Sequence, residues 1–444
     1  MTDMTIVPPG TLDLGTTITN TGDQPAPSGV DAERGTGQTV QSASGQYYLN
    51  PQFISPRLQT TRGIYPGAKG EEIATLVVDG LIYEDWETVW FQWTLGDPWA
   101  SFKFTATEDE TDIWSWDAIL KRFKPGDECM LYLGGWPVMR GVILVRQVAY
   151  DKSNHTIVLQ GTTLTYYAAN ASIIDEKSEF EGTFLEIAGK VLAPTCSGYK
   201  VWGAISQLPF KDPQRPEPGE SIFAFLERIA RDRKVIVTSD PYGDFLFIGE
   251  HEGEYVSDLV EGGNILKCQA IIADLKARSE FIARGQSGAN DEHNGKEAAH
   301  QEARVDGTAK CYNPLLTPIE HPVWTRAEVE LRAQNELMFA EGQGKVEATV
   351  TVQGWFNPRT GLRWDVGQDV RFQSPMTGID DQMMKIRTIT YTQDQNGSLT
   401  TMVITAPWGY NDSRHTRGGG PPATARSDDS PPSTPPTQTP HSSR

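Results

Sequence analysis

The 444-residue sequence predicts a mainly β protein with α+β parts, in which one β-domain occurs twice. Three observations predict this fold. Residues 125–163 contain three strands with their turns, residues 367–406 repeat the same order of elements, and residues 183–229 change to a helical period. Because a three-stranded ribbon buries too little apolar surface to be stable alone, each copy must belong to a larger closed or stacked sheet.

The first copy begins with a short apolar strand over Met130–Leu133. The following Gly134-Gly135-Trp136-Pro137 segment cannot continue a strand, so the chain must reverse there. Residues 142–150 form a long strand with apolar side chains on both faces, and 151–154 form a polar turn. Alternating residues over 156–161 predict the returning strand, which leaves a meander with open edges.

The second copy has the same spacing as the first. The interval from Gly126 to Tyr150 equals that from Gly367 to Tyr391, and both long strands lead into a polar turn that contains asparagine. Chance can produce the turn alone, but the shared order of strand, reversal, strand, turn and strand favours a duplicated β-domain. Two similar β-domains per chain could place six modules in a ring of three subunits, which would adapt threefold to sixfold symmetry.

Helical segments interrupt the strands. Thr183 to Glu186 forms a capping box before an apolar stripe, and a second amphipathic helix begins near Ser221. Composition and period together divide the chain into a flexible N-terminal arm at 1–66, a first β-domain at 67–177, a small α+β domain at 178–265, a second β-domain at 266–410 with an exposed loop at 285–310 and a helix at 325–340, and a disordered tail rich in Pro, Ser and Thr at 411–444.

The composition bounds the function. With 38% hydrophobic residues the chain has enough apolar side chains for a sizeable core, and its formal net charge of -19 argues against a protein that coats DNA or RNA. An acidic surface is typical of soluble proteins, and it would also let nucleic acid pass without binding. The four cysteines lie far apart without a CxxC pair, so we expect reduced thiols in a cytoplasmic protein. No basic-then-apolar leader and no apolar run of membrane-spanning length is present, which predicts no membrane insertion.

Motifs for chemistry are weak. The sequence has no GxSxG, HExxH or P-loop motif and no GxGxxG after a strand, so we predict a protein that is not an enzyme and has no catalytic, cofactor or metal site. Three patterns are alternatives to this prediction: a metal site at His293, Glu297 and His300, a calcium loop at Glu108–Asp112, which lacks the required Gly and distal Glu, and a stacking platform at Trp86, Trp90, Trp93, Trp99, Trp114 and Trp116.

Two other functions stay open at this point. One is a carbohydrate-acting hydrolase that uses the Trp-rich segment and a carboxylate pair. The other is a polysaccharide- or receptor-binding module that uses Trp90 or Trp93.

A resemblance to a known family rests on the order of many short motifs. They are Asp79–Trp86, Pro125-Gly126-Asp127, Gly134-Gly135, Gly141-Val142-Ile143, His155–Gly161, Gly219–Phe223, Glu261–Leu266, Arg284-Gly285-Gln286 and Thr349–Trp355. Over roughly residues 70–410, these segments resemble the Mu-type baseplate hub proteins of contractile-tailed phages, and the chain is similar to tail protein D and to the N-terminal half of type VI secretion spike proteins. It departs from the family pattern in its long N-terminal arm, in residues 285–310 and in its Pro-rich tail.

The resemblance implies a homotrimeric hub in the tail baseplate of the virion, assembled in the cytoplasm of the bacterial host. Two tube-like β-barrel domains per subunit would form a pseudo-sixfold ring that joins the tail tube to the central membrane-piercing spike. Its expected partners are the spike protein, the tail tube protein and the baseplate wedge proteins, with the tape-measure protein as a further candidate. DNA would pass through the lumen without specific binding, and the acidic surplus would partly line that lumen.

Overall fold

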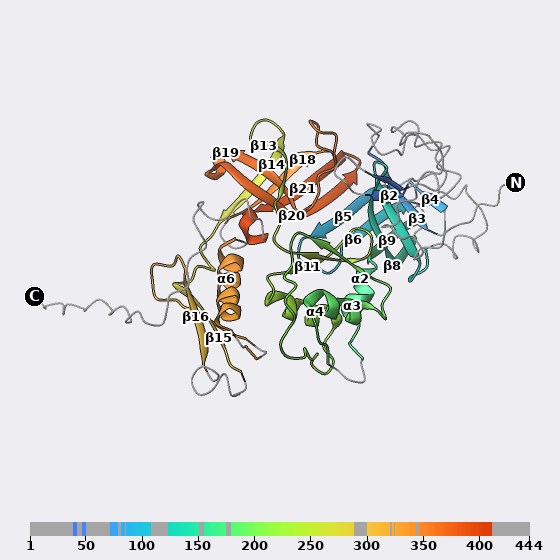
Figure 1. Cartoon of the computed structure of the whole chain (residues 1–444). Helices are drawn as coiled ribbons and strands as arrows, with labels where there is room; N and C mark the ends of the chain where they lie inside the picture. Colours follow the sequence, from blue (N-terminus) through green and yellow to red (C-terminus); the bar gives the residue numbers. More distant parts are fainter. Residues whose placement is uncertain are drawn as a thin grey trace, which may run out of the picture.

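The computed structural model describes residues 39–41, 47–49, 72–78, 81–84, 86–107, 123–150, 155–174, 179–287, 300–319, 322–323, 325–342 and 346–410. The expected tail at 411–444 and most of the expected N-terminal arm lie outside these ranges. A mainly β fold is confirmed, because among the described residues strands are far more frequent than helices, and the helices lie to one side of the largest sheet (Figure 1).

The largest sheet has 13 strands in the described part of the chain. Its strands are β3 (Ala74–Val78), β4 (Leu81–Tyr83), β5 (Thr88–Thr94), β6 (Ser101–Thr107), β7 (Glu128–Leu133), β8 (Trp136–Tyr150), β9 (His155–Thr163), β13 (Glu254–Val260), β14 (Ile265–Ile272), β18 (Val346–Gln353), β19 (Gln368–Ser374), β20 (Ile379–Asp394) and β21 (Gly397–Thr405). Short 3-10 turns η4 (Pro375–Thr377) and η5 (Pro407–Tyr410) flank the second half.

The two halves of this sheet have the same strand order. The N-terminal half runs β5-β6-β9-β8-β7-β3, and the C-terminal half runs β14-β18-β21-β20-β19-β13. One orientation differs, because β3 is antiparallel to β7 whereas β13 is parallel to β19. Strand β5 pairs antiparallel with β20 and so joins the halves. Among the described residues the strand path is open from β14 to β4, so no barrel closes within one chain.

The backbone locates the repeat more finely than the sequence spacing does. The Gly126 N–H donates to the Ile143 carbonyl and the Gly367 N–H to the Ile386 carbonyl, both at 2.8 Å. Each long strand then carries a register shift, one directly after Ile143 and one directly after Ile386. The backbone counterpart of Tyr150 is therefore Gln393, two residues beyond the Tyr391 that equal spacing in the sequence suggests.

The two repeated glycines offer a matched test. Gly126 (φ +100°) and Gly367 (φ +83°) both have backbone angles that a side chain disfavours, but a Cβ on Gly367 would lie 2.8 Å from the Trp202 ring, whereas one on Gly126 meets nothing within 4 Å. We expect Gly367→Ala to lower the free energy of unfolding by about 2–4 kcal/mol, and Gly126→Ala by about 1 kcal/mol. Urea denaturation measures both, and equal losses would contradict the role of the Trp202 contact.

The small α+β domain packs against the N-terminal half. Its three-stranded sheet has the order β10-β12-β11. The capping box of the second helix is present, since the Thr183 side chain accepts from the Glu186 N–H and the Glu186 carboxylate accepts from the Thr183 N–H. Ser221 caps the third helix as expected. The elements are α2 (Thr165–Asn170), α3 (Phe184–Leu192), β10 (Tyr199–Trp202), α4 (Ile222–Arg231), β11 (Ile236–Ser239) and β12 (Phe245–Ile248).

The insertion in the C-terminal half corrects one prediction. Residues 301–306, expected in an exposed loop over 285–310, form strand β16, whereas 288–299 lie outside the described residues. Ala303 and Val305 alternate along this strand and pack against helix α6, a period-2 signal that the surrounding charges obscured. The insertion consists of β15 (Glu280–Gly285), β16 (Gln301–Asp306), β17 (Leu315–Pro318) and α6 (Arg326–Gly342).

Candidate assembly surface

One face of the large sheet is lined by neutral polar side chains. Residues opposite one another in register share a face, and one such row crosses six strands from both halves. It consists of Thr351, Thr401, Thr390, Gln92, Ser101 and Thr162. We call this surface, with its neighbouring row of Thr392, Trp90, Lys103 and Gln160, the hydroxyl face. The opposite face carries the apolar core.

Hydrogen bonds tie the hydroxyl face together across strands. The Gln92 amide donates to Thr390 Oγ1 at 3.2 Å, which spans the junction of the two halves. Thr388 and Thr94 meet across the same junction at 3.2 Å. These bonds join strands that are far apart in sequence, so the two halves present one continuous polar surface.

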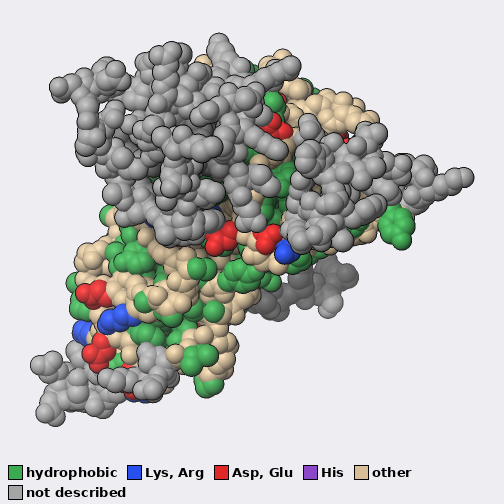
Figure 2. Space-filling model, turned by 90° about the vertical axis from the view of Figure 1, so that its right-hand side faces the viewer, with side chains coloured by type: hydrophobic (Ala, Val, Ile, Leu, Met, Phe, Trp, Pro, Cys, Tyr) green, Lys and Arg blue, Asp and Glu red, His purple; other side chains and the backbone are tan. Residues whose placement is uncertain are grey.

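The hydroxyl face carries few charges in its two rows. Lys103 is the one ionisable residue of these two rows. Outside the rows, Arg387 of β20 pairs with Glu347 of β18 at 3.2 Å. Elsewhere the surface is mixed: on the face shown in Figure 2, charges of both signs and apolar side chains are interspersed over the described part. The described residues of the two rows therefore do not concentrate the acidic surplus of the sequence.

A cavity of about 540 Å³ lies between the sheet and the α+β domain. Its lining includes Trp93, Trp202 and Tyr242, together with two ion pairs. Lys200 lies 2.6 Å from Asp240 and Arg363 lies 2.7 Å from Asp365. Burial raises the pKa of Asp240, and the nearby Lys200 opposes that rise. Asp240 and Asp365 thus each contact a cation, and the third carboxylate of the lining is Glu254.

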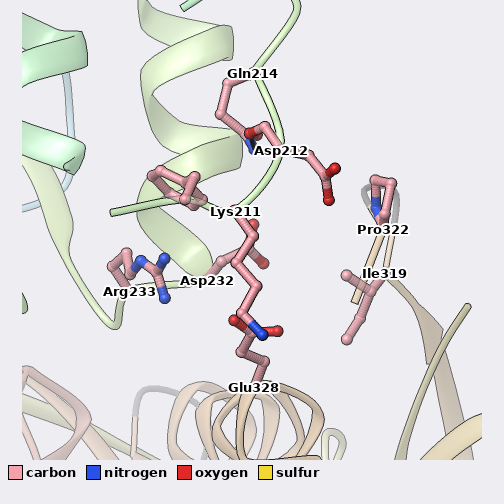
Figure 3. Close-up of a pocket in the computed structure, with 9 residues that line it drawn as sticks. Lys211, Asp212, Gln214, Asp232, Arg233, Ile319, Pro322 and Glu328 are labelled. Atoms are coloured by element: carbon pink, nitrogen blue, oxygen red, sulfur yellow. Dashed lines mark hydrogen bonds between the residues drawn. The ribbon is translucent and has the colours of Figure 1, made fainter. Parts of the chain in front are cut away.

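A second hollow, between the α+β domain and the insertion, is too small for a substrate. Its volume is about 10 Å³, roughly the space of one water. Figure 3 shows Lys211, Asp232 and Arg233 on the side of the α+β domain, with Glu328 of α6 below and Ile319 and Pro322 opposite. The Arg233 guanidinium lies over the Phe210 ring, 4.2 Å from its centroid, and both residues line the hollow from the α+β domain.

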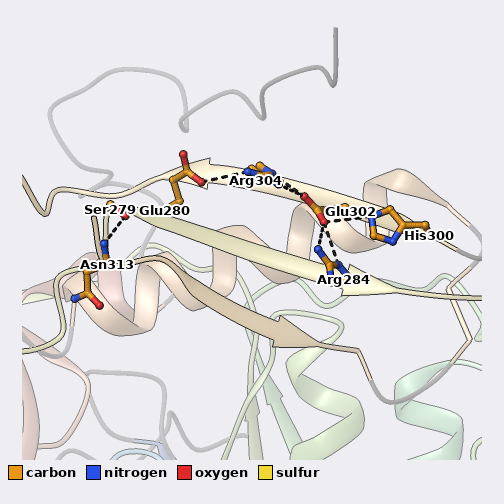
Figure 4. A network of polar contacts seen from close by, with 7 residues as sticks. All are labelled: Ser279, Glu280, Arg284, His300, Glu302, Arg304 and Asn313. Carbon is orange, nitrogen blue, oxygen red and sulfur yellow. Dashed lines mark hydrogen bonds and ion pairs between the residues drawn. The ribbon is translucent and has the colours of Figure 1, made fainter. Parts of the chain in front are cut away.

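A charged network lies on the outer face of the insertion. Glu302 accepts from Arg284 and from Arg304, each at 2.6 Å, and His300 Nε2 lies 3.4 Å from the same carboxylate (Figure 4). The expected metal partners His293 and Glu297 lie outside the described residues. Within the described ranges, no group of three or more His, Cys, Asp or Glu side chains could hold a metal ion.

The Glu302 carboxylate is expected to stabilise the insertion. Burial opposes its charge, but the hydrogen bonds from Arg284 and Arg304 outweigh this and lower its pKa. We expect Glu302→Gln to lower the free energy of unfolding by about 1–2 kcal/mol at pH 7.

A group with a lowered pKa stabilises the fold above its usual pKa and loses this effect as the pH falls through the lowered value, so the cost of Glu302→Gln should shrink in acid. Glu179→Gln is the control, because its pair with Arg215 is exposed and worth under about 0.5 kcal/mol. Denaturation at several pH values measures both, and a cost that stays constant in acid would contradict the assignment.

The tryptophans do not form one platform. Trp93 is buried on the core face of β5, whereas its neighbour Trp90 is half-buried on the hydroxyl face. Trp86 packs on Phe104 and Trp99 on Tyr166. Trp114, Trp116 and the segment Glu108–Asp112 lie outside the described residues.

The four cysteines lie in separate segments of the structure. All four cysteines are free thiols; Cys129 is buried, Cys268 is half-buried, and Cys196 and Cys311 are exposed. None of the described helices is long and apolar enough to cross a membrane.

The two halves of the sheet match two models of one protein family. Residues 73–163 match the N-terminal domain of the Mu phage baseplate assembly protein GpP-like family, and residues 325–413 match the fourth domain of the Mu phage baseplate assembly protein GpP. Together these two matches support a Mu-type phage baseplate family for the chain. This confirms the resemblance in the sequence, and the relatives in this family are structural components of phage tails.

Solved structures of tail proteins share the fold. The 43 kDa tail protein of prophage MuSo2 from Shewanella oneidensis is 24% identical, with a TM-score of 0.65 over 77% of this chain and 100% of that one. A tail protein from Neisseria meningitidis MC58 is 19% identical, with a TM-score of 0.64 over 76% of this chain and 98% of that one. No curated protein sequence matches the chain.

Sequence reasoning missed the hydroxyl face, although a signal for it was present. Thr388, Thr390 and Thr392 alternate along β20, and Thr349 and Thr351 alternate along β18. A period-2 row of threonines between buried apolar residues indicates a strand with one polar face. That the rows of the two halves align, however, depends on the β5–β20 pairing, which no local pattern specifies.

Proposed function

We propose that this protein is the structural hub of a contractile phage-tail baseplate, in which three copies form a pseudo-sixfold ring between the tail tube and the central spike. The observation that carries the proposal is the strand order shared by the two halves of one continuous sheet. If the halves arose by duplication, three chains supply six similar modules, which matches a threefold spike to a sixfold tube.

The hydroxyl face would line the central channel of this ring. Affinity for nucleic acid depends mainly on Lys and Arg contacts to phosphate, and the two rows of this face contain one lysine among neutral side chains. DNA would therefore pass without being held. This assignment replaces the acidic lining that the sequence suggests with a neutral one, and it leaves the acidic surplus to other surfaces.

The tube-like barrel of the family would then form between chains. Among the described residues, the sheet is open at β14 and along Val145–Tyr150 of β8, so closure requires neighbouring copies. The ring would be part of the virion tail, with the spike, the tail tube and the baseplate wedge proteins as its neighbours and the tape-measure protein as a further candidate.

Light scattering on the purified chain at increasing concentration tests the ring. We expect a mass three times that of one chain, and electron microscopy of the same sample should show a ring with a central channel. A stable monomer at high concentration would overturn the proposal. Co-purification with the spike protein, and not with an unrelated trimer, tests the position in the baseplate.

A further inference from the structure

Among the described residues, the junction between β5 and β20 has a counterpart whose two strand segments are not paired with each other. Strand β5 pairs with the second part of β20, Thr388–Gln393. By position in the repeat, β5 corresponds to β14, and Thr388–Gln393 corresponds to Val145–Tyr150 of β8. In the described part of the chain, β14 pairs only with β18, and Val145–Tyr150 pairs only with β9.

Both counterpart segments expose apolar side chains that their equivalents bury. Trp93 and Tyr391 at the internal junction are 7% and 1% exposed. By contrast, their counterparts Ile272 of β14 and Val148 of β8 are 62% and 47% exposed, and Tyr150 at the end of β8 is 78% exposed. Exposed apolar residues on an open strand edge are typical of a surface that another strand covers.

We propose that β14 of one copy pairs antiparallel with Val145–Tyr150 of β8 in the next copy, in the register of the internal β5–β20 junction. The proposal rests on the ring of the proposed function and specifies its contact between chains. Because the two segments are different surfaces, the contact is head-to-tail. Such contacts close into a ring when the rotation per copy allows it, and Figure 1 shows β14 and β8 in different parts of the sheet.

The register follows from the repeat. In the N-terminal half, Phe91 of β5 pairs with Phe102 of β6, which pairs with Gly161 of β9. At the equivalent positions of the C-terminal half, Ala270 of β14 pairs with Ala348 of β18, which pairs with Ile404 of β21. Ala270 is thus the counterpart of Phe91, and Val148 is the counterpart of Tyr391. Because Phe91 faces Tyr391 in the chain, Ala270 should face Val148 between chains.

Two residues away along each strand, Cys268 is the counterpart of Val89 and Tyr150 is the counterpart of Gln393. Because Val89 pairs with Gln393 in the chain, Cys268 should lie opposite Tyr150 between chains. Ile272 falls opposite Arg146, as Trp93 lies opposite Ile389. The exposed Val148, Tyr150 and Ile272 side chains would then turn toward the apolar side of the extended sheet, which accounts for apolar side chains that are exposed in a single chain.

A native cysteine at one of these positions makes the register testable. Directly opposed residues of antiparallel strands have Cα atoms about 4.5–5.5 Å apart, within the range that a disulfide spans. In a Cys196→Ser, Cys311→Ser background, Tyr150→Cys should form a disulfide with Cys268 of the next copy under mild oxidation. The expected product is a ladder of covalent dimers and trimers on a non-reducing gel that collapses to one band with reductant.

Gln147→Cys in the same background is the matched control. The proposed register places it opposite Ile271, so it should give at most one tenth of the cross-linked product.

Val148→Asp is the second variant, and it should reduce the mass in solution to that of one chain without loss of circular dichroism. Because the short strand β2 (Tyr47–Leu49), which pairs with β1 (Thr39–Gln41), contacts β8, the assay is repeated on a chain that lacks residues 1–71, with the same ladder expected.

The outcomes separate the two proposals. A threefold mass without the Tyr150→Cys ladder, or with equal cross-linking of Gln147→Cys, would overturn this register and leave the ring standing. A ladder that appears only after residues 1–71 are removed would show that β2 occupies the β8 edge and would also overturn the contact. A chain that remains a monomer at high concentration would overturn the ring itself.

Discussion

Replacing Lys385 by methionine is expected to lower the free energy of unfolding by about 3–5 kcal/mol, because it leaves a buried carboxylate without its cation. Lys385 Nζ lies 2.6 Å from Asp369 Oδ1, and both side chains are 0% exposed. The same ammonium donates to the Gly367 carbonyl at 3.0 Å, at the turn that begins the repeated unit. The loss should therefore appear in the C-terminal half of the sheet, where β19 pairs with β20.

The double variant Asp369→Leu, Lys385→Met is the control for this result. Replacing both partners removes the desolvation cost of two buried charges, so most of the lost stability should return. The N-terminal half supports this expectation, since the counterpart positions there are Glu128 and Val142, only one of which ionises. Urea denaturation measures all three proteins, and a single variant no less stable than the double would contradict the prediction.

Phe91→Ala should have an effect of similar size, about 3–5 kcal/mol, because it empties a large buried site. Phe91 is 1% exposed and stacks on Tyr391 with ring centroids 6.0 Å apart. These rings belong to β5 and β20, so the cavity would open at the junction that joins the two halves. We expect amide hydrogen exchange to increase in β5 and in the second part of β20 before it increases elsewhere in the sheet.

Trp90→Ala is the matched control on the neighbouring position. Trp90 lies on the hydroxyl face and is half-buried, so its removal should cost under about 1.5 kcal/mol and leave the exchange pattern unchanged. If Trp90→Ala proved as costly as Phe91→Ala, the assignment of the two faces of β5 would be wrong.

Local patterns in the sequence were sufficient for most elements. Alternation predicted the strands of both repeated units, and the capping residues Thr183 and Ser221 predicted where α3 and α4 begin. These signals depend on neighbours a few residues apart, so they are present in the sequence itself. Strand β16 was missed because only Ala303 and Val305 mark it among charged residues.

The sequence by itself predicted that a β-unit recurs and that its long strand at 142–150 has apolar side chains on both faces, and it showed the resemblance to baseplate proteins. Only the tertiary structure decided that β5 pairs with β20, that Lys385 reaches Asp369, and that Tyr150 corresponds to Gln393. These facts depend on pairing between distant segments and on a register shift, and a one-residue slip in pairing reverses every side chain without altering the local pattern. The physical reason is that strand pairing is set by the packing of the whole sheet.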